Sequence, residues 1–223
     1  EGELVSVIGP SGCGKSTVLN IVAGLIAPTA GTVSFGEPTM KVSYVFQRPR
    51  LLPWRNVERN VAFSLEQSNI SRERRSAAIK QAIQRVNLEG HEHKFPHQLS
   101  GGMQQRVAIA RGLAIEPRLL LLDEPFGSLD ALTRSYMQEE LLGIVRGSGT
   151  TAILVTHDID EALLLADRIL VMSSRPGQIK HELQVPFGSQ RALDDLLQNP
   201  DYGRIKATLR ELLRPEVSEE IGG

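Results

Sequence analysis

The sequence predicts an α/β protein with a mostly parallel sheet, into which a helical lobe is inserted. Short apolar runs alternate with helical patterns, and between about residues 48 and 116 the sequence turns polar and helix-favouring. Runs that are apolar throughout are typical of strands buried on both faces of a parallel sheet. The predicted strands are Leu4–Ile8, Val42–Phe46, Leu119–Leu122, Ala152–Thr156 and Arg168–Met172.

The 223 residues are expected to form one domain with three parts. The core lobe covers about 1–47 and 117–180, the helical lobe about 48–116, and a C-terminal extension about 181–223. Beyond Gly177 a short extended piece leads into apolar residues at helical spacing. These residues are Tyr202, Ile205, Leu209, Leu212 and Leu213. The extension could regulate the core, dock on it, or serve only as a packing strap, and the strap is the simplest interpretation.

Composition argues against several function classes. The 25 basic residues balance 26 acidic ones, so no polyanionic partner such as a nucleic acid is indicated. Arg72, Arg74 and Arg75 are interpreted as a solvated helix face. Since the apolar stretches are far shorter than the ~18 residues of a spanning helix, any role at a membrane is expected from outside the bilayer. Cys13 is the only cysteine, which excludes an internal disulfide and fits a reducing compartment.

The segment GPSGCGKST has the pattern of a phosphate-binding loop, with a predicted strand before it and a predicted helix, Ser16–Leu25, after it. Backbone N–H groups of such a loop and the helix N-terminus hold phosphate oxygens. Lys15 is expected to reach the β- and γ-phosphates, Ser16 to hold Mg²⁺ and Thr17 to add a phosphate contact. A glycine-rich turn without a ligand is the alternative. The predicted ATP-binding residues here are Gly9, Pro10, Ser11, Gly12, Cys13, Gly14, Lys15, Ser16 and Thr17.

The segment LLLLDEP, 119–125, is predicted to be a buried strand that delivers two carboxylates at its end, where open α/β sheets keep their ligands. Asp123 is expected to orient the Mg²⁺ shell. Glu124 is placed to take a proton from an attacking water, a role typically worth about 10² to 10⁴ in rate. An Asp-Glu pair that merely closes a strand is the alternative.

A second glycine-rich helix start, LSGGMQQR at 99–106, predicts a second anion site. Ser100 offers a hydroxyl, Gly101 and Gly102 offer backbone N–H groups, and the following helix favours negative charge at its start. Because this segment belongs to the inserted lobe, it is not expected to reach the phosphate that Lys15 holds.

Taken together, these motifs resemble the ATP-binding subunit of ABC transporters, and LSGGMQQR is similar to that family's signature sequence. The resemblance implies that Gln47 contacts Mg²⁺ and the attacking water, that His157 is the switch histidine, and that Asp130 belongs to the D-loop near the nucleotide. Taken singly, Gln47 or His157 would more often be a capping or core polar residue.

The resemblance also implies a head-to-tail dimer of two copies with shared ATP sites. The signature residues, Ser100, Gly101, Gly102 and Gln104, would bind the ATP of the second copy. Family members also carry an adenine-stacking aromatic residue upstream of the phosphate loop. Only eight residues precede Gly9, so that platform and the strands around it are expected to be missing, which weakens ATP binding.

Two segments favour an importer subunit. In the family, the region that matches 48–61 forms the groove for a cytoplasmic helix of the membrane-spanning permease. Leu51, Leu52 and Trp54 would be its contacts, or else ordinary core of the helical lobe. The segments 123–134 and 173–179 resemble importers of nitrate, sulfonate, taurine and bicarbonate.

The expected function is therefore that of an ATPase coupled to solute uptake, peripheral to the cytoplasmic face of the inner membrane and served indirectly by a solute-binding protein. A non-transport ABC ATPase of the repair or translation type is the main alternative. However, the sequence shows neither long heptad repeats nor a second ATPase unit. A P-loop kinase would have no use for LSGGMQQR, and an importer for another solute class stays open.

Overall fold

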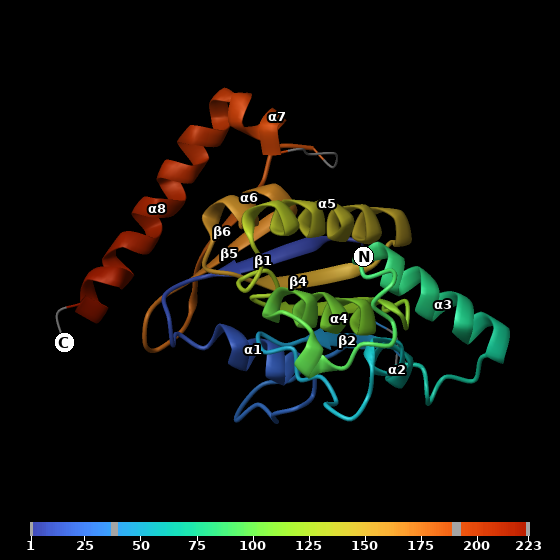
Figure 1. Ribbon diagram of the computed structural model, residues 1–223. Coiled ribbons are helices and arrows are strands. Elements are labelled where there is room, and N and C mark those ends of the chain that lie inside the picture. The colour runs from blue at the N-terminus through green and yellow to red at the C-terminus, as the bar shows by residue number, and fades with distance from the viewer. Residues whose placement is uncertain (1, 37–39, 189–192, 222–223) are drawn as a thin grey trace. The chain divides into compact units, whose positions relative to one another are not determined.

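The structure is a computed structural model that describes residues 2–36, 40–188 and 193–221 (Figure 1). It divides into two compact units, the first made of residues 1–34 and 145–223 and the second of residues 35–144. These units do not coincide with the lobes expected from composition, which remain a prediction.

The first unit is built on four strands in the order β4-β1-β5-β6. Strand β1 (Leu4–Ile8) runs parallel to β4 (Thr151–Val155) and to β5 (Arg168–Met172), whereas β6 (Ile179–Gln184) pairs antiparallel with β5. All five residues of β1 are buried, including Ser6 in the middle of its otherwise apolar sequence. Strand β6 corresponds to the extended piece expected after Gly177, and its exposed, polar sequence suits a sheet edge.

Within the described part of the first unit lie four complete helices: α1 (Lys15–Val22), α6 (Ile159–Leu165), α7 (Leu193–Gln198) and α8 (Pro200–Ile221). Helix α6 begins at Asp158, whose carboxylate accepts the N–H groups of Asp160 at 2.8 Å and Glu161 at 3.2 Å. This cap satisfies two donors that the first turn leaves without helical partners. Helix α6 therefore starts directly behind His157.

The second unit contains the parallel strands β2 (Val42–Val45) and β3 (Leu119–Asp123). Its helices are α2 (Val57–Phe63), α3 (Arg72–Arg85), the 3₁₀ helix η1 (Pro96–Gln98) and α4 (Gly101–Leu113), and α5 (Ala131–Ser148) crosses the boundary between the units. At Gly112 helix α4 approaches β2 closely, since a Cβ there would lie 3.0 Å from Cγ2 of Val45. Glycine permits this close packing.

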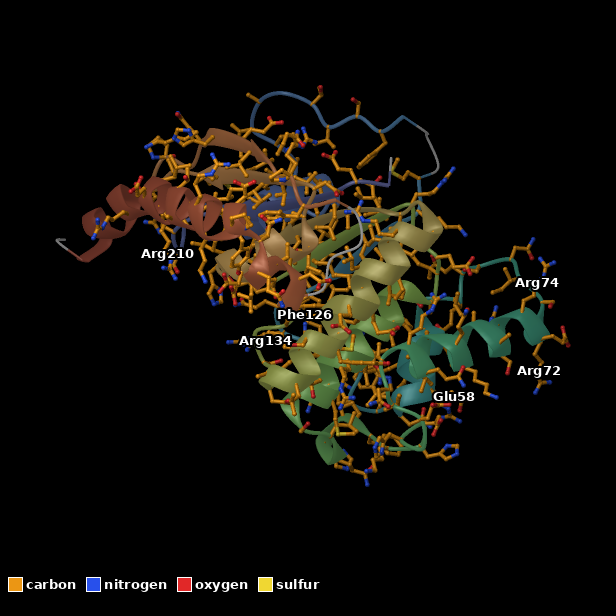
Figure 2. All side chains as sticks on the ribbon, turned by 90° about the horizontal axis from the view of Figure 1, so that it is seen from above. Glu58, Arg72, Arg74, Phe126, Arg134 and Arg210 are labelled. Atoms are coloured by element: carbon orange, nitrogen blue, oxygen red, sulfur yellow. The ribbon has the colours of Figure 1, made fainter. Side chains whose placement is uncertain are left out.

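The α/β fold with a mostly parallel sheet is confirmed, and each of the five predicted strands is present with its ends shifted by no more than one residue. Residues 48–116 contain only helices and loops. Figure 2 shows Arg72 and Arg74 projecting from α3, and both are exposed, as a solvated face requires, whereas Arg75 is only half-exposed. None of the described helices combines the length and the apolar sequence that crossing a bilayer requires.

The C-terminal extension docks on α6 within the first unit. Tyr202, Ile205 and Leu209, three of the residues at helical spacing, are buried. At the edge of this contact, Tyr202 donates its hydroxyl to Oδ1 of Asp160 at 2.5 Å, and Lys206 donates to Oδ2 at 2.7 Å. Burial opposes the charge of Asp160, but the hydrogen bonds from Lys206 and Tyr202 outweigh it and hold the pKa of the carboxyl below its ordinary value.

The first prediction concerns the anchor of α8, the pair of hydrogen bonds that Asp160 accepts from Tyr202 and Lys206. Asp160→Asn should lower the free energy of unfolding by about 1 kcal/mol, or roughly 2 to 4 °C in Tm, because the pair is partly exposed. A carboxyl whose pKa is lowered on folding stabilises the folded state above its ordinary pKa, and this contribution disappears as the pH falls through the lowered value. The difference between parent and variant should therefore shrink in acid. The control is Asp201→Asn, which removes an exposed ion pair with Arg204 on α8. Equal losses of Tm for the two variants would contradict the role of Asp160 in holding α8.

Candidate functional site

The phosphate-binding loop joins β1 to α1 within the first unit. Gly12 has a φ of 73° and Gly14 a φ of 106°, both in the left-handed region that favours glycine. Gly14 is the N-cap of α1 and has no side chain to accept the N–H groups of the first turn. These N–H groups and the helix dipole suit an anion such as phosphate.

Lys15 is buried inside this loop. Its ammonium group donates to the carbonyl oxygens of Gly9 at 2.8 Å and Pro10 at 2.6 Å. A buried cation is costly unless it is paired, and here the loop's own carbonyls supply the partners. Ser16 and Thr17 follow on the exposed first turn of α1. A positive charge, the N–H groups of a helix start and two hydroxyls thus lie on one short segment, and they fit a polyphosphate.

In the second unit, β3 ends at the predicted carboxylates. Asp123 is buried, and Tyr44 of the neighbouring strand β2 donates its hydroxyl to Oδ2 of Asp123 at 3.4 Å. Burial and the nearby Asp123 charge raise the pKa of the Tyr44 hydroxyl above its ordinary value. Sequence reasoning missed Tyr44, because its place beside Asp123 depends on the register of β2 against β3.

Gln47 and Glu124 meet in the same unit. Gln47 donates from Nε2 to Oε2 of Glu124 at 3.1 Å, although 77 positions separate them. Glu124 has a φ of 45°, an uncommon conformation for a residue with a side chain and one that costs energy. This turn comes directly after the buried end of β3. A carboxylate held by an amide donor is suitably oriented to accept a proton from water.

The signature segment begins helix α4. Ser100 is the N-cap, and its hydroxyl accepts the N–H of Met103 at 3.2 Å. A Cβ at Gly102 would lie 3.3 Å from Cδ2 of Leu129, so the segment packs beside the residue that precedes Asp130. Gln104 donates its amide to the carbonyl oxygen of Pro96 at 3.0 Å. The binding of ATP by Ser100, Gly101, Gly102 and Gln104 stays a prediction.

Gln105 makes a contact beside Gln47 that the sequence did not predict. Its side chain is buried, and Nε2 donates to the carbonyl oxygen of Phe46 at 3.3 Å, directly before Gln47. It lies within LSGGMQQR, but the contact joins segments 59 positions apart. The sequence signalled only a polar residue within this motif. A buried amide needs a hydrogen-bond partner, but its burial is known from the structure alone.

Short-range hydrogen bonds form at Asp130 and on either side of His157. The N–H of Thr133 donates to Oδ1 of Asp130 at 3.0 Å, and this bond holds the pKa of Asp130 below its usual value. His157 is exposed after β4, between Thr156 and Asp158, whose hydroxyl and N–H form a 3.0 Å hydrogen bond. Their roles toward a nucleotide stay predictions.

A phosphate-binding loop together with a strand that ends in adjacent carboxylates defines the class of P-loop nucleoside triphosphatases. Comparison with known families narrows this class. Residues 1–127 match the family described as ABC transporter. The chain belongs to this family, whose members bind ATP through such cassettes.

Characterised relatives and a solved structure agree with this assignment. The taurine import ATP-binding protein TauB of Yersinia pestis bv. Antiqua is 50% identical over 196 residues, covering 86% of this chain and 77% of the relative. The aliphatic sulfonates import ATP-binding protein SsuB 2 of Pseudomonas syringae pv. tomato is 49% identical, covering 97% and 89%. The dimeric structure of a bacterial ABC transporter cassette matches with a TM-score of 0.76 at 35% identity, covering 84% of this chain and 88% of that one.

The second prediction tests the capping role of Ser100 at the start of α4. Ser100→Ala should lower the free energy of unfolding by about 1 kcal/mol, because an N–H of α4 loses its acceptor, whereas Ser100→Asp should retain the cap. Denaturant unfolding measures both. The matched control is Ser71→Ala, which removes the equivalent cap of α3 from the N–H of Arg74. Equal losses for Ser100→Asp and Ser100→Ala would contradict the capping role.

Proposed function

We propose that this protein is the ATP-hydrolysing subunit of an ABC importer for a small sulfonate or related oxyanion. The observation that carries the ATPase function is the pairing of Gln47 with Glu124 in a chain whose phosphate-binding loop encloses Lys15. Family membership and the import proteins among its relatives support coupling to uptake.

In this proposal the loop Gly9–Thr17 binds the phosphates of ATP. Lys15 exchanges the carbonyl oxygens of Gly9 and Pro10 for phosphate oxygens, which carry full negative charge and are the stronger acceptors. Ser16, Gln47 and Asp123 would hold Mg²⁺, since hydroxyl, amide and carboxylate oxygens are the ligands that this ion prefers. When bound, Mg²⁺ neutralises charge that develops on the phosphate oxygens.

Glu124 is the proposed general base. Its carboxylate accepts a proton from the attacking water, and the amide of Gln47 keeps the carboxylate in one orientation. Tyr44 occupies one oxygen of Asp123 and thereby limits its rotation. His157 is proposed to contact the γ-phosphate from the exposed turn after β4.

We further propose that the chain acts as a head-to-tail dimer of two copies. Ser100, Gly101, Gly102, Gln104 and Asp130 of one copy would contact the ATP held by the other. The uncrowded position of Gly101 supports an open N-terminus of α4, since among the described residues no atom beyond its chain neighbours and its own helix backbone lies within 4 Å of a Cβ placed there. The similar cassette structure is itself dimeric.

The proposed membrane partner is a permease that docks on the loop after Gln47. Trp54 is 69% exposed there, which favours a contact with a partner over a place in the core. The loop is held by the fully buried Asn60. Its side-chain oxygen accepts the N–H of Leu52, and its Nδ2 donates to the carbonyl oxygen of Leu52. The same Nδ2 also donates to the carbonyl oxygens of Arg55 and Asn56. An exposed tryptophan on a fixed loop loses little entropy on binding.

The importer would therefore be peripheral to the inner membrane at its cytoplasmic face, and a solute-binding protein would contribute indirectly. The solute class rests on the taurine and sulfonate relatives. Reconstitution with its permease and solute-binding protein tests this assignment. A sugar or a peptide that alone stimulates ATP hydrolysis would contradict the oxyanion class.

The third prediction tests hydrolysis. Glu124→Gln should reduce turnover by about 10²-fold or more while ATP still binds, because an amide cannot take up the proton yet still accepts the hydrogen bond from Gln47. With ATP the variant should sediment as a dimer. Phosphate release and analytical ultracentrifugation measure the two effects. Glu139→Gln, on the exposed side of α5, is the control, and turnover of Glu124→Gln within a few-fold of the parent would exclude Glu124 as the base.

The fourth prediction tests the membrane partner. Trp54→Ala should weaken co-purification with the permease by about 30-fold in affinity, as truncation of a central aromatic contact does. Basal ATP hydrolysis of the isolated subunit should not change. Leu197→Ala removes a comparably exposed apolar side chain from α7 and serves as the control. Unchanged retention of the permease by Trp54→Ala would place the docking surface elsewhere.

A further inference from the structure

The connection between β5 and β6, residues 173–178, lies against the phosphate-binding loop within the first unit. Two glycines mark this contact. A Cβ at Gly9 would lie 2.9 Å from the carbonyl oxygen of Met172, and a Cβ at Gly177 would lie only 1.9 Å from the carbonyl oxygen of Cys13. Both distances are shorter than real Cβ contacts allow. The first part of the phosphate-binding loop is therefore backed directly by main chain from the end of β5 and the turn after it.

The contact at Gly177 has a defined direction. The Cβ position lies 1.9 Å from the carbonyl oxygen of Cys13 and 3.1 Å from its carbonyl carbon, and the difference is about the length of a C=O bond. The carbonyl group therefore points end-on at Gly177. In a trans peptide the next N–H points the opposite way. The N–H of Gly14 is thus directed away from the β5–β6 connection.

Glycine is required at position 177 because there is no room for a side chain. Its φ lies outside the left-handed region, so an alanine would meet no backbone strain of that kind. An alanine methyl group would instead displace the Cys13 carbonyl or the connection by about 1 Å, given the usual closest contact of carbon and oxygen. The Cys13–Gly14 peptide immediately precedes Lys15.

Hydrogen bonds within the connection between β5 and β6 hold it in one conformation, so it supports the phosphate-binding loop firmly. Ser173 is buried; its N–H donates to the carbonyl oxygen of Gln178 at 2.9 Å, and its hydroxyl accepts the N–H of Gln178 at 3.0 Å. The same hydroxyl donates to the carbonyl oxygen of Pro176 at 2.9 Å. Gly177 is therefore fixed from both sides. Arg175 lies beside the loop as well, with Nη2 3.3 Å from a Cβ placed on Gly12.

We infer that Gly177 is a positioning residue for nucleotide binding, which orients the Cys13–Gly14 peptide so that the N–H of Gly14 faces the phosphates of ATP. The inference rests on the proposed binding of ATP by Gly9–Thr17 and extends it to a segment outside the phosphate-binding motif. The hydrogen bond from an N–H to a charged phosphate is among the stronger ones, so its orientation affects affinity directly.

The fifth prediction tests this role with Gly177→Ala. The variant should raise the Kd for Mg-ATP and for Mg-ADP by about tenfold or more, because a hydrogen bond to a charged group is lost. Its KM for ATP should rise by a larger factor than its kcat falls, since Glu124 and Gln47 are untouched. Isothermal titration calorimetry, ATPase kinetics and thermal unfolding without nucleotide measure these effects.

The matched control is Gly203→Ala on α8 of the same unit, where nothing lies within 4 Å of a Cβ. It should bind Mg-ATP like the parent. Should Gly177→Ala fail to fold, Ser173→Ala opens the connection without adding an atom, and about a threefold rise in Kd is expected from the loss of its hydrogen bonds. A parental Kd in Gly177→Ala, or in Ser173→Ala if only that variant folds, would overturn the inference. Equal weakening by Gly203→Ala would also do so, whereas a parent that does not bind Mg-ATP would overturn the proposed function itself.

Discussion

Complete burial of β1 and β3 is the constraint on which the rest of the structure depends. Every residue of both strands is shielded from solvent, so neither strand can present a side chain to a ligand along its length. Chemistry is possible only where each strand ends. The phosphate-binding loop follows β1, and the paired carboxylates Asp123 and Glu124 stand at the end of β3. In each unit the chemistry therefore lies beyond the carboxyl end of a buried strand, which is where α/β proteins bind their ligands.

Close main-chain contacts and buried amides hold several of the segments that carry the sequence motifs. Glycine permits these contacts at Gly112, where α4 meets β2, and at Gly9 and Gly177, where the end of β5 and the following turn support the phosphate-binding loop. Buried amides add to them: Gln105 bonds the chain before Gln47, and Asn60 fixes the loop that carries Trp54. Segments held in this way lose less conformational entropy on binding than freely moving loops do.

Two groups of the predicted site lower the stability of the folded state. Lys15 is a buried cation whose partners are neutral carbonyl oxygens, and Glu124 adopts a left-handed backbone conformation. Such costs are tolerated where the surrounding structure enforces them, and they concentrate at functional sites. Both residues are those to which the motifs assign phosphate binding and proton transfer.

The sequence by itself determined the parallel α/β fold, the five strands and the identity of the family, because buried strands and phosphate-binding loops impose strict local patterns of apolar residues and glycine. It could not place Tyr44 beside Asp123 or Gln105 on the carbonyl of Phe46, because those contacts depend on strand register and on the approach of α4 to β2. The docking of α8 on Asp160 and the support of Cys13 by Gly177 were likewise decided only by tertiary structure. Each of these contacts joins residues that are far apart in the chain, and local patterns carry no information about which distant surfaces will meet.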